Sequence, residues 1–241
     1  MSDNPYILQR YAQELVAALF SEGIHKTYIN KVVFVVGGTN CDSGQEDHLL
    51  SAFGLKRLNS DHALEYLLNK EGMHLDMTSY SDDTQERKYQ IRDRAKEIAA
   101  AQEKLYAGGN WGIAIDARGK DYEKVRRVRE EFVNRGYDIF MVFVNTALKR
   151  ELAQNAICSR RLPEQVVTEV WEKVITHIGK FFNLFGYSHS LIVDNNGEMS
   201  SLSTDDVIIY ASHCVQQFLD RPVTVSIKRH KEFTHTPQRD R

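Results

Sequence analysis

The stretch that most constrains the fold of this chain is 31–47, KVVFVVGGTNCDSGQED. Its apolar and mostly β-branched run at 32–36 predicts a buried strand. Glycines at 37–38 and a Ser-Gly pair at 43–44 predict turns, and a helical pattern led by Glu46 follows them. A strand, a glycine-rich turn and a helix in this order bring free backbone N–H groups to a helix N-terminus, where they attract phosphate. This stretch therefore predicts the centre of a sheet and a ligand site at its end.

The loop differs from the signature of a phosphate-binding P-loop at several points. That signature is G-x-x-x-x-G-K-[ST], in which the lysine contacts phosphates and the hydroxyl contacts the metal. Here Gln45 follows Gly44 and Glu46 comes next. The spacing from Gly37 or Gly38 to Gly44 is also longer than the signature, by two residues or one. The layout of a P-loop is present, whereas the groups that contact phosphate and metal are changed.

Composition excludes several classes of protein. The 241 residues suffice for one α/β domain with a full core. A net charge of -2, from 31 basic and 33 acidic residues, gives no overall field for nucleic acid or for an anionic membrane. No apolar run approaches the roughly 20 residues of a membrane-spanning helix, and the first residues lack the layout of a signal peptide. The three cysteines are widely spaced, so we expect reduced thiols in a cytoplasmic protein.

Apolar strand patterns alternate with helical ones along the chain, which is typical of βαβ units and a parallel sheet. The expected strands lie near 31–36, 55–58, 111–115, 138–144 and 190–194. We predict an α/β fold with a doubly wound parallel five-stranded sheet flanked by helices. Ligands of such sheets bind beyond the carboxyl ends of the strands.

Helical periodicity adds detail around this sheet. Residues 5–22 predict a helix ahead of the first strand, and Ser60 or Asp61 is expected to cap the helix that follows the second strand. A long charged helix is expected over 84–106, with Leu105 on its apolar face together with Ile91, Ala95, Ile98 and Ala99. Nine histidines form no H-x-x-x-H or H-E-x-x-H pair, so a zinc site is not indicated.

Seven segments of this chain carry a resemblance to a known family. They are VVFVVGG, GLKRLNSDHALEYLLNKEG, RDRAKEIAAAQEKLYAGGNWGIAIDARGKDYEKV, GYDIFMVFVNTALKRELAQNA, RLPEQVV, SLIVDNN and FLDRPVT, and together they span roughly residues 31 to 225. In order and spacing the chain resembles the zeta-toxin-like, polynucleotide-kinase-like P-loop kinases that many tailed phages encode. The resemblance implies an N-terminal helical extension at 1–30, a P-loop kinase-like domain at 31–221 with a lid near 155–163, and a short C-terminal tail at 222–241.

The resemblance also assigns roles to individual residues. It implies a nucleotide-binding loop made of Gly37, Gly38, Ser43, Gly44, Gln45 and Glu46. Asp61 matches the acidic group that meets the phosphate-accepting substrate, and Asp116 matches the strand-end acid that helps to hold Mg²⁺ through water. Arg160 matches a lid arginine. The lid pattern resembles Asn-x-x-Arg-x-Arg, and Cys158 occupies its first arginine position. On the residues alone, Asp61 fits a helix cap as well as it fits this role. Asp116 could simply end a strand, but an acid at a strand end beside a glycine loop favours an inherited metal role.

Two functions follow as hypotheses. The first is a degenerate phage kinase-like protein without efficient catalysis, which acts as a binding or structural component with a phage or host protein partner. Such a protein would lie in the host cytoplasm or in the phage particle, with no membrane or nucleic-acid partner expected. The alternative is an active or residual ATP- and Mg-dependent kinase that phosphorylates a hydroxyl of a nucleotide, sugar-nucleotide or polynucleotide. In that case Asp61, Asp116 and Arg160 would be its catalytic residues.

Overall fold

The computed structural model describes residues 28–37, 53–75, 82–158, 160–196 and 204–224. Within them five strands form one sheet in the order β2-β3-β1-β4-β5, and every neighbouring pair is parallel. The strands are β1 (Lys31–Val36), β2 (Lys56–Leu58), β3 (Ile113–Ala117), β4 (Asp138–Asn145) and β5 (Ser190–Asp194). The predicted doubly wound parallel sheet is thereby confirmed.

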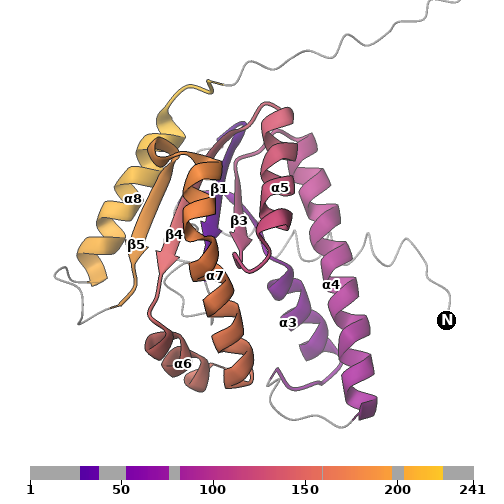
Figure 1. The fold of residues 1–241 in the computed structure, drawn as a ribbon. Helices are drawn as coiled ribbons and strands as arrows, with labels where there is room; N and C mark the ends of the chain where they lie inside the picture. The colour runs from indigo at the N-terminus through magenta and orange to yellow at the C-terminus, as the bar shows by residue number, and fades with distance from the viewer. Residues whose placement is uncertain (1–27, 38–52, 76–81, 159, 197–203, 225–241) are drawn as a thin grey trace, which may run out of the picture.

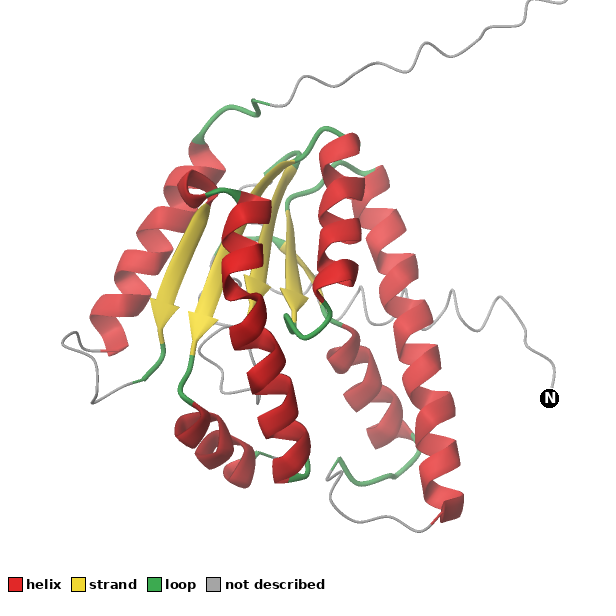
Figure 2. Ribbon diagram, in the orientation of Figure 1, coloured by secondary structure: helices red, strands yellow, loops and turns green. Residues whose placement is uncertain are grey.

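Helices cover both faces of this sheet (Figure 1). They are α3 (Ser60–Lys70), α4 (Asp82–Gly108), α5 (Tyr122–Asn134), α6 (Leu148–Ile157), α7 (Glu164–Phe185) and α8 (Thr204–Asp220), with a 3₁₀ turn at Tyr187–His189. Side chains of α4, α5 and α7 pack with one face, and those of α8 pack with the other. Figure 2 shows the strands between these two helical layers. No described helix has the length and apolarity needed to cross a membrane.

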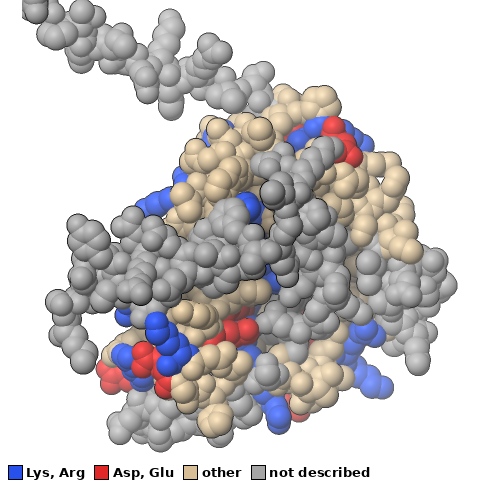
Figure 3. Space-filling model, turned by 180° about the vertical axis from the view of Figure 1, so that it is seen from behind, with Lys and Arg blue, Asp and Glu red and all other residues tan. Residues whose placement is uncertain are grey.

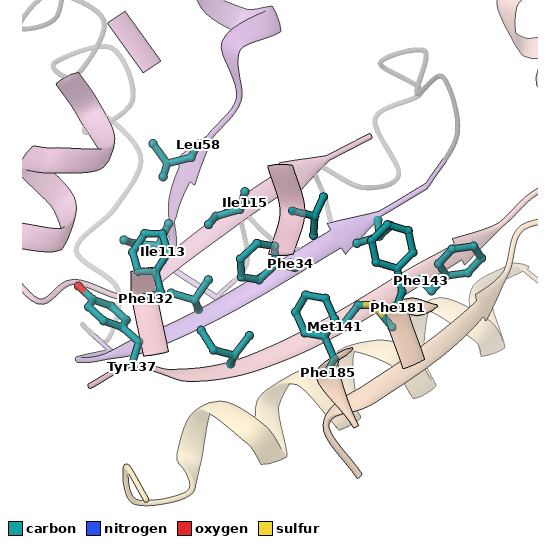
Figure 4. Close-up of a cluster of buried hydrophobic side chains, with 14 of the residues drawn as sticks. Phe34, Leu58, Ile113, Ile115, Phe132, Tyr137, Met141, Phe143, Phe181 and Phe185 are labelled. Atoms are coloured by element: carbon teal, nitrogen blue, oxygen red, sulfur yellow. The ribbon is translucent and has the colours of Figure 1, made fainter. Parts of the chain in front are cut away.

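The larger part of the core lies between the sheet and α4, α5 and α7. Figure 4 shows Phe34 and Met141 from the two central strands meeting Phe185 and Phe181 of α7. All six residues of β1 are buried, because this strand lies between β3 and β4 and both of its faces are covered. A continuous apolar run suits such a strand. The run at 32–36 therefore forms the centre of the sheet, as predicted.

Two local predictions are corrected. The N-cap of α3 is Asn59, not Ser60 or Asp61, because the Asn59 side chain accepts a hydrogen bond from the backbone N–H of Asp61 at 2.7 Å. Leu105 is 53% exposed. The buried stripe of α4 instead continues from Ile98 through Gln102 and Tyr106. A polar glutamine at a stripe position hides this register from a search for apolar periodicity.

Predictions for the N-terminal helix at 5–22 and for most of the tail lie outside the described residues. The first tail residues do contact the domain, since the backbone N–H and the hydroxyl of Thr224 donate to the Asp138 carboxylate. The proposed domain bounds stay a prediction.

Candidate functional site

The candidate site lies at the carboxyl ends of the strands, where α3 and α6 extend beyond the arrowheads in Figure 1. Gly37 follows β1 and is buried. Asp116 pairs with Val35 in the parallel register of β3 and β1, so its carboxylate is one strand away from the end of β1. The other predicted loop residues, namely Gly38, Ser43, Gly44, Gln45 and Glu46, lie outside the described residues, and their predicted role is untested.

Asn59 links two of the predicted acidic residues. Its side-chain oxygen caps α3 at the N–H of Asp61, 2.7 Å away. Its amide nitrogen donates to Oδ2 of Asp116 at 2.8 Å. One side chain thus fixes the start of α3 relative to the end of β3. The link places Asp61 and Asp116 at the same edge of the sheet.

Arg160 contacts the carboxylate of Asp61 through both Nη atoms of its guanidinium group. Nη1 lies 2.8 Å from Oδ1, and Nη2 donates to Oδ2 at 3.0 Å. Paired contacts of this kind are the strongest and most directional form of an arginine–carboxylate interaction. Nε of Arg160 also lies 3.6 Å from Oε1 of Glu65. The predicted lid arginine and the predicted acceptor-side acid are therefore bound to each other.

A second arginine, Arg118, contacts the same carboxylate. Its Nη2 donates to Oδ2 of Asp61. The side chains of Asp61, Arg118 and Arg160 are 14%, 21% and 8% exposed, so their charges are largely shielded from water. We call these three residues the ionic cluster.

The segment that carries Arg160 is held by Asn155, the first residue of the predicted lid pattern. Its amide nitrogen donates to the carbonyl of Leu162 at 2.8 Å. Its oxygen accepts from the N–H of Leu162 at 2.9 Å. Asn155 is buried in the last turns of α6, and the two bonds close a clasp around the connection to α7. This clasp fixes the chain on both sides of Arg160.

The ionic cluster changes the acidity of Asp61. Burial acts to raise the pKa of this carboxyl, but the charges and hydrogen bonds of Arg118 and Arg160 outweigh it and lower the pKa to about 2. A general base works best when its pKa lies near the operating pH. In the described arrangement Asp61 is thus a weak base, and its oxygens already accept hydrogen bonds.

Further basic groups surround the cluster. Desolvation, together with the nearby charges of Arg118, Arg92 and Lys173, lowers the pKa of Lys120. These groups come from α4, the β3–α5 connection and α7, so cations from three parts of the fold gather around Lys120, which also lies near Asp61. On the rear face of the molecule, Figure 3 shows acidic side chains beside basic ones at the top and at the lower left.

The chain keeps some, but not all, of the groups that the implied ATP and Mg²⁺ would contact. The Asp116 carboxylate, at the end of β3 beside β1, has the chemistry to hold Mg²⁺ through water. Among the described residues there is no group of three or more His, Cys, Asp or Glu side chains that could hold a metal ion. In the sequence, Gln45 and Glu46 replace the lysine and the hydroxyl of the P-loop signature. At these two positions the sequence differs from the P-loop signature, whereas Asp116 keeps a carboxylate at the end of β3.

Sequence reasoning missed Arg118 and Asn59. Arg118 lies two residues after Asp116, a spacing that returns a side chain to the same face of an extended strand. Asn59 precedes a helix and is among the most favoured N-cap residues. Both residues therefore had a signal in the sequence, although neither signal reveals which residue the side chain contacts.

The cysteines correct one expectation. Cys214 is a free thiol, but Cys158 is disulfide-bonded. The remaining cysteine, Cys41, lies outside the described residues. The expectation of three reduced thiols is wrong for Cys158.

Comparisons with known proteins identify the fold and leave the family open. No protein-family model matches the chain, and no curated protein sequence matches it. A solved chain from the PezAT chromosomal toxin–antitoxin system of Streptococcus pneumoniae is similar, with a TM-score of 0.55 and 9% identity over 91% of this chain and 99% of that chain. A gluconokinase from Sinorhizobium meliloti 1021 has a TM-score of 0.47 and 11% identity, covering 80% and 95%. A shikimate kinase from Bacteroides thetaiotaomicron has a TM-score of 0.44 and 10% identity, covering 79% and 99%.

The match to the Streptococcus pneumoniae chain extends over nearly the whole of both proteins. At this identity the similarity concerns the fold alone, since a fold hosts many functions. Together with the strand order β2-β3-β1-β4-β5, it shows that the chain has an α/β, P-loop kinase-like fold.

Proposed function

We propose that this protein is a P-loop kinase-like protein that binds a partner and does not transfer phosphate efficiently. The observation that carries the proposal is the pairing of Arg160 with Asp61 through contacts of 2.8 and 3.0 Å. In this arrangement the lid arginine neutralises the chain's own acid, so neither group is available for its part in phosphoryl transfer.

The physical chemistry of phosphoryl transfer supports the proposal. The reaction depends on positioning and on cations that neutralise developing charge. Loss of one such stabilising group typically costs roughly 100- to 1000-fold in rate. Here Gln45 replaces the loop lysine and Glu46 adds negative charge beside it, while Arg160 is engaged by Asp61. Two sources of positive charge are thus missing from the phosphate position.

Binding with a protein partner is the role we assign to the retained fold. The family resemblance supports a phage or host protein as that partner, with the protein in the host cytoplasm or in a phage particle. Affinity purification of the tagged full-length chain from infected cells, with mass spectrometry of purified particles, tests this part. This part of the proposal is contradicted if no specific partner is recovered and the chain is not found in the particles.

The catalytic part is tested with ATP. Calorimetry with ATP and Mg²⁺ should give no binding at micromolar concentrations, and a phosphotransfer screen should give no product. A Gln45→Lys/Glu46→Thr variant restores the two signature groups, raises the net charge by two and should gain ATP affinity. Gln154→Lys/Gln165→Lys adds the same two positive charges on α6 and α7 and serves as the control. Micromolar binding of ATP by the unmodified chain, followed by turnover, would contradict the proposal.

A second candidate function is an ATP-dependent kinase acting on a hydroxyl. The observation that favours it is that Asp61, Asp116 and Arg160 come from separate elements and gather at one edge of the sheet. Nucleoside, sugar-nucleotide and polynucleotide acceptors should then be phosphorylated by the unmodified chain, and Asp61→Asn should abolish turnover. Full turnover in this variant would exclude Asp61 as the base.

A further inference from the structure

We propose that Arg118 and Arg160 form a binding site for a phosphate-bearing ligand, and that Asp61 occupies this site from within the chain when the ligand is absent. The inference rests on the proposed function, because a site closed by its own carboxylate does not turn over. It adds to that function the chemistry of the ligand and the group with which this ligand competes.

The geometry of the arginines supports the ligand class. Arg160 presents both Nη atoms to the two oxygens of Asp61, and Arg118 adds a donor to Oδ2. A planar guanidinium matches the oxygens of a phosphate in the same paired manner as those of a carboxylate. Two guanidinium groups that converge on one carboxylate are therefore also arranged for phosphate.

The segment that carries Arg160 is held independently of Asp61. Asp61 lies in the first turn of α3, Arg118 follows β3, and Arg160 lies between α6 and α7. The clasp of Asn155 on Leu162 holds the Arg160 segment without using Asp61. A change of the Asp61 rotamer alone would thus leave the Arg160 segment in place for an incoming anion.

The charge around the cluster favours a phosphate over the single carboxylate. Arg118, Arg92 and Lys173 lie near Lys120, and burial together with these positive charges lowers the pKa of Lys120. Opposing them are Asp61 itself, Glu65 at 3.6 Å from Arg160 and Asp116, which is bound by Asn59. A phosphate group carries more negative charge than the carboxylate that it displaces. Replacement of Asp61 by phosphate would thus neutralise more of the surrounding positive charge.

Removal of the Asp61 charge is the direct experiment. Inorganic pyrophosphate is titrated by calorimetry into the full-length protein and into Asp61→Asn. We expect this variant to bind pyrophosphate roughly tenfold more tightly or better, since two arginines lose their internal partner. Glu65→Gln is the matched control, because it removes one negative charge beside Arg160 without removing a paired contact. The control should bind as the unmodified chain does.

The arginines are tested in the Asp61→Asn background. Addition of Arg118→Gln or Arg160→Gln should abolish the gained affinity, whereas Arg161→Gln, at the neighbouring exposed arginine, should preserve it. Equal affinity of Asp61→Asn and the unmodified chain would overturn the inference. An equal gain in Glu65→Gln would also overturn it, because net charge alone would then explain the binding. Parallel titrations with ATP tell a nucleotide ligand from a simpler phosphate.

Circular dichroism checks that Asp61→Asn folds. If it does not, pyrophosphate at high concentration is compared in Arg160→Gln and Arg161→Gln by thermal shift. Stabilisation that is lost only in Arg160→Gln supports the site, and stabilisation that is equal or absent in both overturns it. Phosphate transfer from ATP by the unmodified chain would contradict the proposed function without changing the ranking of pyrophosphate affinities. The two failures are therefore distinguishable.

Discussion

Nζ of Lys31 lies 2.9 Å from Oδ2 of Asp138, and the two side chains are 3% and 9% exposed. The pair joins the first residues of β1 and β4 at the edge of the sheet opposite the candidate site. The Lys31 ammonium also lies 4.7 Å from the centre of the Phe218 ring in α8. Thr224 donates to the same carboxylate from the start of the tail. This one pair ties two strands, α8 and the tail together.

We predict that breaking this pair strongly destabilises the protein. Asp138→Ala or Lys31→Met leaves one buried charge without its partner, which typically costs about 3–5 kcal/mol in the free energy of unfolding. The double variant Lys31→Met/Asp138→Leu should recover much of this loss, because neither charge then remains buried. Urea unfolding measures all three. Single variants within about 0.5 kcal/mol of the unmodified chain would contradict the prediction.

Stability should fall in acid because of Asp61. Its pKa is lowered from 3.8 to about 2 in the folded chain, so the folded state favours the ionised form. The resulting stabilisation is present above the unfolded value and is lost as pH falls from about 4 toward about 2. It amounts to about 2 kcal/mol. The pKa of Asp138 is also lowered, since the hydrogen bonds from Lys31 and Thr224 outweigh burial, and it contributes with the same sign.

Urea unfolding as a function of pH measures this effect. Asp61→Asn should show a shallower acid-induced loss than the unmodified chain. Asp93→Asn, which removes a carboxylate 72% exposed and paired with Lys96, should keep the original slope because surface pairs contribute little. An unchanged slope in Asp61→Asn would show that the ionic cluster does not stabilise the folded chain.

Most of the sheet was predictable because each strand has a recognisable pattern in its own local sequence. The apolar run at 32–36 and the strand-like run that forms β4 identify the two central strands directly. The register of α4 could not be predicted in the same way, because the polar residue Gln102 is buried on the face of the helix that packs in the core. Periodicity assigns such a residue to the solvent-exposed face.

The candidate site was predictable only in part. Asp61, Asp116 and Arg160 were found through the family pattern, and the structure places all three at one edge of the sheet. Their pairing could not be predicted, because Arg160 and Asp61 are 99 residues apart in sequence, and Arg118 and Asp61 are 57 apart. Which cation meets which carboxylate depends on how the helices pack, and no local pattern contains that information.

Gly119 should resist substitution. It has φ +64°, and an added Cβ would meet Cγ1 of Val36 at 2.9 Å. Gly119→Ala should therefore cost about 1–3 kcal/mol through backbone strain and crowding at the end of β1. Gly179→Ala is the matched control, because no atom lies within 4 Å of its added Cβ in α7. That change should stabilise the helix by about 0.5–1 kcal/mol. Thermal unfolding measures both, and equal effects would contradict the prediction.

Asn155 should hold the Arg160 segment in place. Asn155→Ala removes both hydrogen bonds to Leu162 and leaves its backbone groups without these partners, which costs roughly 1–3 kcal/mol. The segment around the exposed Arg161 should then be cut faster by trypsin, because local opening exposes the backbone to protease. Gln154→Ala, one residue earlier on α6, is the control and should be cut at the original rate. Equal rates in the two variants would show that packing of α6 and α7, and not the clasp, positions Arg160 against Asp61.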